Sequence, residues 1–83
     1  MNKNIIITGG LGFIGSNLIK ILIKKKYFVI NIDKISYASN FYNTLKFNKS
    51  KNYRFYKANI NDKKKIKNIF NKYKPIAIFN LAA

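Results

Sequence analysis

Three evenly spaced glycines directly follow the first apolar run of the chain. Residues 4–8 read N-I-I-I-T, and glycines then stand at positions 9, 12 and 15. A short β-branched run bounded by glycine is typical of a strand buried on both faces of a parallel sheet. Gly9 permits a tight turn, Gly12 lets the backbone approach a ligand, and Gly15 lets a helix pack against the sheet. The pattern predicts a strand, an anion-binding loop and a helix.

An acidic residue stands where such a loop would need it. A second strand is predicted at 27–32, and Asp33 follows it at once. A carboxylate there can accept both ribose hydroxyls of an adenosine, and its charge disfavours a 2′-phosphate. Loop and carboxylate together predict a dinucleotide site that prefers NAD to NADP, although the neighbouring Lys34 could accept a 2′-phosphate.

The rest of the chain alternates between strand and helix patterns. Strands are predicted at residues 4–8, 27–32, 53–58 and 76–81, the last of them buried. Helices are predicted at residues 13–26, from Asn40 in the polar stretch, and from a cap at Asp62 to Tyr73. The inward positions are expected to be Ile14, Leu18, Ile21 and Leu22 in the first helix, Phe41, Leu45 and Thr44 in the second, and Ile66, Ile69 and Phe70 in the last.

This βαβαβαβ order predicts an α/β fold: a Rossmann-like doubly wound parallel sheet, of which only the first half is present. The 83 residues leave no room for a second domain. We therefore expect residues 1–83 to be the N-terminal part of an NAD-binding Rossmann domain. With half the sheet missing, an apolar edge near residues 76–83 should leave the chain poorly stable or prone to aggregate.

The net charge of +15, taken alone, indicates a polyanion partner such as nucleic acid. Lys supplies all of the positive charge except that of Arg54, whereas sequence-specific nucleic-acid readers favour the bidentate fork of Arg. Lys, Asn and Ile are all abundant here, and all three have A- and T-rich codons. Genomic base bias therefore explains the charge more simply, and no nucleic-acid partner is expected.

Several chemistries are excluded by residue types that the chain lacks. It contains no Cys and no His, which removes disulfides, a thiolate nucleophile, a soft metal site and an imidazole base. No apolar run approaches the roughly 18 residues of a membrane span. The N-terminus lacks the apolar segment of a signal peptide. We expect a cytoplasmic protein with no metal and no membrane partner.

Three segments resemble a known family. T-G-G-L-G-F-I-G at 8–15 resembles the cofactor loop of the extended short-chain dehydrogenases, which include the NAD-dependent epimerases and dehydratases. N-I-D-K-I-S-Y-A-S-N at 31–40 is similar to the segment after the second strand of the dTDP-glucose 4,6-dehydratases, and N-L-A-A at 80–83 to the strand before their substrate loop. The likeness covers essentially this whole chain, but only about the first quarter of a full enzyme.

The resemblance implies where NAD would bind. The pyrophosphate would meet the loop and the start of the helix, the adenosine ribose the segment after the second strand, the adenine the segment after the third, and the nicotinamide side the end of the chain. The residues assigned to the cofactor are Gly9, Gly12, Phe13, Ile14, Gly15, Asp33, Lys34, Ile35, Ser36, Asn59, Ile60, Leu81, Ala82 and Ala83. The chain departs from the family at Asn59, where Asp is common, at Asn80, where His is, and at Ser39, where Gly is.

The resemblance also implies a reaction. NAD would remove hydride from C4 of a nucleotide-bound glucose, water would leave across C5 and C6, and the hydride would return to C6. The family's catalytic Tyr-x-x-x-Lys and acid pair lie beyond the position of Ala83. Two such spacings here, Tyr42–Lys46 and Tyr53–Lys57, are interpreted as accidental, because this many tyrosines and lysines give about one such pair by chance. Tyr53 and Lys57 also lie on a predicted strand, where four residues separate side chains by about 13 Å.

We therefore expect no catalytic residue in this chain and no turnover from it alone. The full-length enzyme is expected to be a homodimer that acts on a nucleotide sugar, dTDP-glucose. Two alternatives stay open. An epimerase or another dehydratase of the same fold could share the cofactor loop, and the chain could be a complete, non-catalytic nucleotide- or nucleic-acid-binding module.

Overall fold

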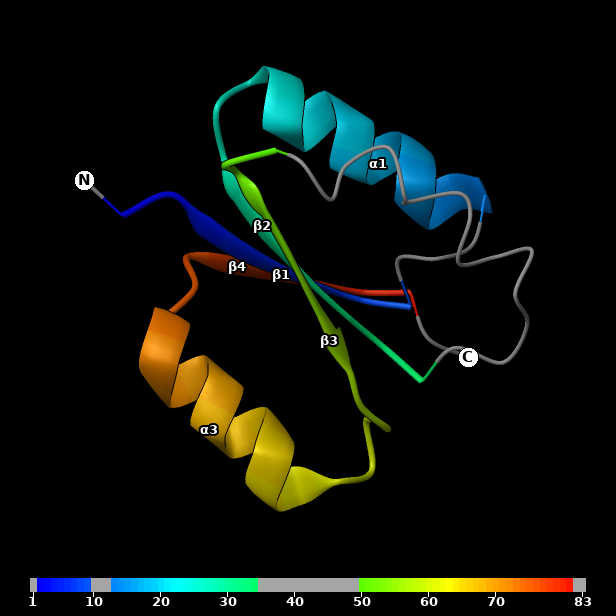
Figure 1. The fold of residues 1–83 in the computed structure, drawn as a ribbon, viewed down its shortest axis with the longest axis vertical. Coiled ribbons are helices and arrows are strands. Elements are labelled where there is room, and N and C mark those ends of the chain that lie inside the picture. Colours follow the sequence, from blue (N-terminus) through cyan, green and yellow to red (C-terminus); the bar gives the residue numbers. More distant parts are fainter. Residues whose placement is uncertain (1, 10–12, 35–49, 82–83) are drawn as a thin grey trace.

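A computed structural model of the chain describes residues 2–9, 13–34 and 50–81, and shows a parallel sheet between two helices (Figure 1). The elements are β1 (Asn4–Thr8), α1 (Phe13–Lys24), β2 (Phe28–Asp33), β3 (Tyr53–Lys57), α3 (Lys63–Tyr73) and β4 (Ala77–Asn80). The strands are ordered β3-β2-β1-β4, and every pairing is parallel. The predicted Rossmann-like α/β fold is confirmed, and the helix expected from Asn40 falls outside the described residues.

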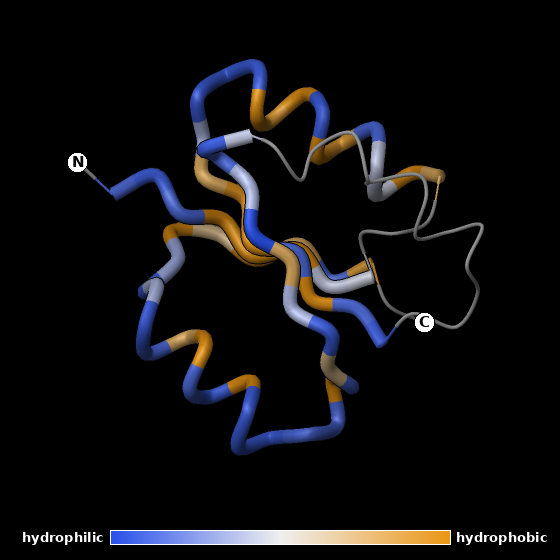
Figure 2. The backbone as a smooth tube through the Cα atoms, in the orientation of Figure 1, coloured by the Kyte–Doolittle hydropathy of each residue, from blue (hydrophilic) through white to orange (hydrophobic). Residues whose placement is uncertain are grey.

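The two central strands carry the core because side chains alternate between the faces of a sheet. Ile5 and Ile7 of β1 pack with α1, whereas Ile6 and Ile30 pack with α3 on the other face. All four are buried. Figure 2 shows the same division, with hydrophobic residues along the central strands and hydrophilic residues on the outer sides of the helices. A strand buried on both faces must be a continuous apolar run, as the sequence pattern indicated.

The sequence signals at both ends of α3 are confirmed. The Asp62 carboxylate accepts a hydrogen bond of 3.2 Å from the backbone N–H of Lys65, which makes it the N-cap. At the other end Lys74 adopts the left-handed conformation, with φ of 46°, and its N–H donates to the Phe70 carbonyl. Pro75 follows directly, where it cannot continue the helix.

The inner face of α3 is also the predicted one. Ile69 is buried, and Ile66 and Phe70 pack partly buried beside it. The N-terminal segment reaches this helix from the far end of the sequence. The side-chain amides of Asn2 and Asn4 donate to the carbonyls of Lys74 and Tyr73 at 2.6 and 2.7 Å. These two bonds supply donors to carbonyls at the helix end, which have no N–H partner within the helix.

The predicted inner face of α1 is partly wrong. Gly15, Ile19 and Leu22 are buried, whereas Ile14 and Ile21, expected to point inward, are 74% and 51% exposed. The helix is rotated so that the residue without a side chain lies nearest the sheet, and positions four and seven residues later then share its face. Several element boundaries also differ from the prediction by one or two residues: α1 ends at Lys24, β2 runs from Phe28 to Asp33, β3 ends at Lys57, and β4 runs from Ala77 to Asn80.

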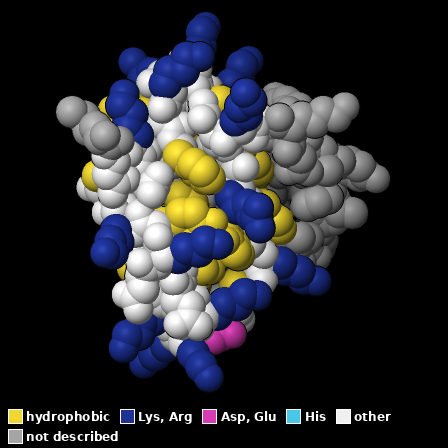
Figure 3. Space-filling model, turned by 60° about the vertical axis from the view of Figure 1, so that its left-hand side comes forward, with side chains coloured by type: hydrophobic (Ala, Val, Ile, Leu, Met, Phe, Trp, Pro, Cys, Tyr) yellow, Lys and Arg dark blue, Asp and Glu magenta, His cyan; other side chains and the backbone are white. Residues whose placement is uncertain are grey.

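The prediction that β4 is buried is wrong. The strand lies at one edge of the sheet, and Ile78 and Phe79 are 48% and 38% exposed. By register Phe79 faces the side of α1 and Ile78 the side of α3, so both faces of the strand expose apolar surface. An apolar area bordered by Lys and Arg side chains is visible on one face of the molecule (Figure 3). The expected apolar edge is thus present, as far as the described residues reach.

Candidate functional site

The first part of the site is the turn at the end of β1. Gly9 has φ of 76°, in the left-handed region that glycine enters without steric cost. Its N–H donates to the Ile32 carbonyl at 2.9 Å, so the chain is still tied to the end of β2 as it leaves the sheet. The role predicted for Gly9, a tight turn out of the strand, agrees with this geometry. Gly12, assigned to the closest backbone approach, lies outside the described residues.

The second part is the N-terminus of α1. Its first turn contains no acidic residue, so no side-chain carboxylate of the helix competes for the positive end of the dipole. The Ser16 hydroxyl and the Asn17 amide both donate to the Phe13 carbonyl, at 3.1 and 3.0 Å, and neither bond uses an N–H of the first turn. Gly15 is buried against the sheet and brings the helix close to it. The arrangement favours an anion.

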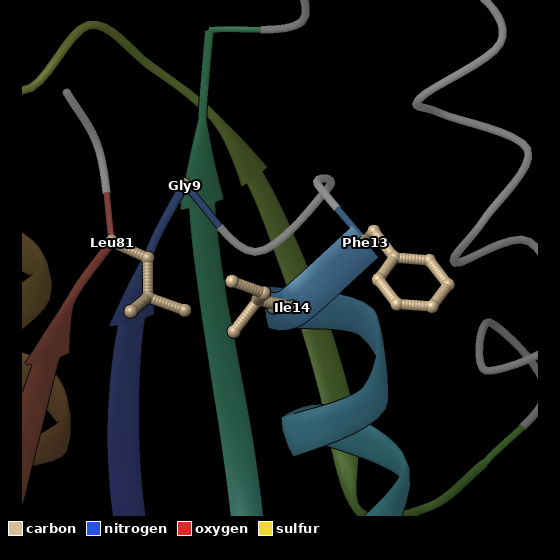
Figure 4. A pocket seen from close by; sticks show the side chains of 5 residues that line it. Gly9, Phe13, Ile14 and Leu81 are labelled. Carbon is tan, nitrogen blue, oxygen red and sulfur yellow. The ribbon is translucent and has the colours of Figure 1, made fainter.

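These parts meet in a cavity of about 340 Å³ (Figure 4). Ile14 and Leu81 point towards each other across it, while the ring of Phe13 points away. The volume is at the lower end of the range for small-molecule sites. The residues that line the cavity come from three separate segments and were all predicted as cofactor contacts: Gly9, Phe13, Ile14, Gly15 and Leu81.

The position of this cavity follows from the strand order. From β1 the chain passes first to β2 on one side, and β4 later pairs on the other side. The strand order therefore reverses between β1 and β4. Open α/β sheets bind ligands at such a topological switch point, beside the carboxyl ends of the strands. The fold itself places the cavity at the start of α1.

The predicted ribose residues lie at the same edge of the sheet. Asp33 is half-buried at the end of β2, is the register partner of Lys57, and accepts the Ala58 N–H through its carbonyl at 3.0 Å. Lys34 is exposed. Neither residue lines the cavity. Ile35 and Ser36 fall outside the described residues, as does Ser39.

The predicted adenine residues lie on the turn between β3 and α3. Asn59 and Ile60 are both exposed there. The side-chain oxygen of Asn59 accepts from the backbone N–H of Asn61 at 2.9 Å, and its carbonyl accepts from that of Asp62 at 2.9 Å. Asn59 therefore has a local role as a turn former. Its amide oxygen has a second lone pair that an adenine amino group could still use.

The Tyr-x-x-x-Lys spacing on β3 places its two residues in different environments, Tyr53 in the core and Lys57 at the surface. The Tyr53 hydroxyl is buried and accepts from the side-chain amide of Asn31 at 3.1 Å, inside the core. Lys57 is exposed, and its carbonyl accepts from the ammonium group of Lys65. Tyr42 and Lys46 fall outside the described residues. In the part of the chain that the structure describes, no cluster of His, Cys, Asp or Glu could hold a metal ion, and no helix is long and apolar enough to cross a membrane.

Two tyrosines that join β3 to α3, Tyr56 and Tyr73, have shifted pKa values. The hydroxyls of Tyr56 and Tyr73 lie 2.6 Å apart. Burial raises the pKa of Tyr73 to about 12, helped by the hydrogen bond with Tyr56. Burial alone would raise the pKa of Tyr56 as well, but the bond with Tyr73 and the charges of Lys72 and Arg54 outweigh it and lower that pKa. This pair holds the sheet and the helix together and lies outside the cavity.

Sequence reasoning missed one contact at the site. The Thr8 hydroxyl donates to the side-chain oxygen of Asn80 at 2.6 Å, between the last paired residues of β1 and β4. Asn80 had stood out only as a departure from a family pattern. The register of two parallel strands that are distant in sequence cannot be read from composition or spacing. The sequence therefore contains no pattern that predicts the contact between Thr8 and Asn80. Ala82 and Ala83, assigned to the nicotinamide side, lie outside the described residues.

Comparison with known proteins finds one family model, described as GDP-mannose 4,6 dehydratase, that matches residues 6–83. A dTDP-glucose 4,6-dehydratase of Haemophilus influenzae is 48% identical over 81 residues, which are 96% of this chain and 24% of the relative. The chain thus spans about a quarter of the length of that curated relative.

Solved structures agree. A dTDP-glucose 4,6-dehydratase from Bacillus anthracis in complex with NAD superposes with a TM-score of 0.89 at 33% identity, over 96% of this chain and 26% of that one. A UDP-glucose 4-epimerase from Thermotoga maritima with UDP-glucose superposes with a TM-score of 0.78 at 36% identity, over 96% of this chain and 24% of that one. Dehydratases and epimerases therefore share this arrangement of strands and helices.

Proposed function

Because this chain belongs to the GDP-mannose 4,6-dehydratase family, we propose that it is the N-terminal, NAD-binding part of a nucleotide-sugar dehydratase. The observation that carries the proposal is the cavity between the Gly9 turn, the start of α1 and Leu81. It lies at the switch point of the sheet, beside the positive end of a helix dipole.

The chemistry of the cavity suits a dinucleotide pyrophosphate. The backbone N–H groups of the first turn of α1 would hold its oxygens, and Ile14 and Leu81 would exclude water from one side. Asp33 would accept the ribose hydroxyls of the adenosine half. The positive charge of Lys34 would instead favour NADP, because it could bind a 2′-phosphate. A bound NAD would accept a hydride from the substrate, and the role of this chain's own residues is to bind and orient it.

The substrate that we propose for the whole enzyme is dTDP-glucose. Support comes from the dehydratase relative in Haemophilus influenzae, which matches this chain over nearly its full length. Oxidation at C4, loss of water and reduction at C6 would use residues other than those that line the cavity. A homodimer in the cytoplasm is the proposed state of that enzyme.

An epimerase of the same fold is the second candidate, and the Thermotoga maritima structure favours it, since its identity to this chain is no lower than that of the dehydratase from Bacillus anthracis. The cofactor is common to both proposals. If the dehydratase proposal holds, the full-length protein that contains this chain should convert dTDP-glucose to a 4-keto-6-deoxy sugar, which absorbs in alkali. An epimerase would instead yield the 4-epimer with no such absorbance.

The cofactor assignment is tested by calorimetric titration of the chain with NAD, at several salt concentrations. A DNA oligonucleotide is titrated in parallel, because the charge of +15 makes a polyanion the natural competitor. Affinity for DNA should fall steeply with salt, as counterion release requires, and affinity for NAD should change little. Absence of NAD binding together with salt-sensitive DNA binding would replace this proposal by that of a polyanion-binding module.

A further inference from the structure

Thr8 and Asn80 join the ends of two neighbouring strands. They are register partners, the Thr8 hydroxyl donates to the Asn80 side-chain oxygen at 2.6 Å, and the Leu81 N–H donates to the Thr8 carbonyl at 2.8 Å. Thr8 is only 4% exposed. A hydroxyl buried to this degree is costly to leave without a partner, so the bond with Asn80 is one the fold has reason to keep.

The two residues adjoin the cavity without lining it. Gly9 follows Thr8 and Leu81 follows Asn80, and both of these followers line the cavity. Because side chains alternate along a strand, Thr8 shares the face of Ile6, which packs on the side of α3. The bond therefore lies on the opposite face of the sheet from α1. Thr8 and Asn80 can act on the cavity only through Gly9 and Leu81.

Because β4 is an edge strand, the bond between Thr8 and Asn80 can stabilise its end. Among the described strands β4 pairs with β1, and its residues from Ile78 onward are exposed. The last backbone bond of such a strand opens easily, because few buried contacts resist its local unfolding. A side-chain bond at the final register pair opposes that opening, just before the chain reaches the cavity.

We propose that Thr8 and Asn80 are positioning residues of the cofactor site: their side-chain bond holds Leu81 at a fixed separation from Gly9 and so sets the width of the cavity. This inference rests on the proposed NAD-binding function. The acceptor is an amide, which does not titrate near neutral pH. The strand ends therefore stay fastened across the physiological range, which an imidazole at the same position would not ensure.

The test compares Thr8→Val, which removes the hydroxyl while keeping the shape, with Thr8→Ser, which keeps it. In Thr8→Val the NAD dissociation constant should rise about threefold to tenfold, the equilibrium factor of one neutral hydrogen bond, and Thr8→Ser should restore most of the affinity. Amide hydrogen exchange gives a reading without cofactor. The exchange rate of Leu81 relative to that of Val29 should rise in Thr8→Val and remain near wild type in Thr8→Ser.

Asn4→Ala is the matched control for a loss of stability. Asn4 begins the same strand, and its side-chain bond lies at the end far from the cavity. This variant should speed the exchange of Leu81 and Val29 alike, with their ratio and the NAD affinity unchanged. A change of that ratio equal to the one in Thr8→Val would overturn the inference, because the effect would then be general destabilisation.

A pH profile separates positioning from packing. Asn80→His puts a nitrogen near the place of the amide oxygen, and protonation with a pKa near 6.5 removes its ability to accept. NAD affinity of Asn80→His should therefore fall below about pH 6.5 when Thr8 is present, and the fall should be smaller in a Thr8→Val background. Equal profiles in the two backgrounds would refute the bond's role, since they would reflect charge alone.

The failure of the function and the failure of this inference are distinguishable. If the wild-type chain binds no NAD, the proposed function fails, and the exchange ratio of Leu81 to Val29 by itself decides whether the bond positions Leu81. If NAD binds but Thr8→Val changes neither the affinity nor that ratio, the function stands and the positioning role is refuted.

Discussion

The hydrogen bond between the Asn4 side chain and the end of α3 should contribute more to the free energy of unfolding than the exposed bond that Asn2 makes beside it. Asn4 is partly buried, and its amide donates to the Tyr73 carbonyl at 2.7 Å across 69 positions of sequence. Asn4→Ala removes a net contribution of about 0.5–1.5 kcal/mol and leaves the carbonyl partly shielded from water. We expect a total loss of about 1–2 kcal/mol. A domain of this size has roughly 4–12 kcal/mol in all.

The assay is urea unfolding followed by far-ultraviolet circular dichroism. With a urea slope of about 1 kcal/mol per molar, the midpoint should fall by about 1–2 M. Asn2→Ala is the comparison, because the amide of Asn2 makes an equally short bond, 2.6 Å, to the Lys74 carbonyl, but an exposed one. Water replaces that bond readily, so its loss should shift the midpoint by less than about 0.5 M. Equal shifts in both variants would refute the reasoning from burial.

Three further predictions concern the cofactor, the tyrosine pair and the sheet edge. Replacing Gly12 by Leu should abolish NAD binding, and Asp33→Ala should weaken it about tenfold or more while narrowing the preference over NADP; calorimetry that finds both variants unchanged contradicts the cofactor assignment. In absorbance titration at 295 nm, the pair of Tyr56 and Tyr73 should ionise in two steps, one below pH 10 and one near pH 12, and Tyr56→Phe should bring the upper step back towards 10. The raised pKa of Tyr73 means that the folded chain holds this proton longer than the unfolded chain does, so its contribution to stability should be lost between pH 10 and 12 in alkaline unfolding curves. Ile78→Lys should reduce aggregation, measured by light scattering, and leave NAD affinity unaltered; persistent aggregation would show that the β4 edge is not its cause.

The sequence by itself determined the order of the elements and most of the cavity. The run at residues 4–8 favoured a strand buried on both faces over an alternating edge strand, because every residue after Asn4 is β-branched and three of the four are isoleucine. Asp62 and Pro75 bounded α3 through local hydrogen bonding and local steric exclusion. Gly9 predicted a tight turn and Gly15 predicted close packing of a helix on the sheet. Both predictions depend only on the local sequence, because glycine lacks the side chain that would prevent either.

The tertiary structure decided what depends on how the elements pack. The helical spacing placed Ile14 and Leu18 equally well on the predicted inner face of α1. Packing against the sheet instead buries the face that contains Gly15, and Ile14 lines the cavity. The apolar run at 76–81 has the composition of a central strand, but its place in the strand order put it at an edge. Thr8 and Asn80 met because parallel pairing set their register, and pairing between distant segments is a property of the whole sheet, not of either segment.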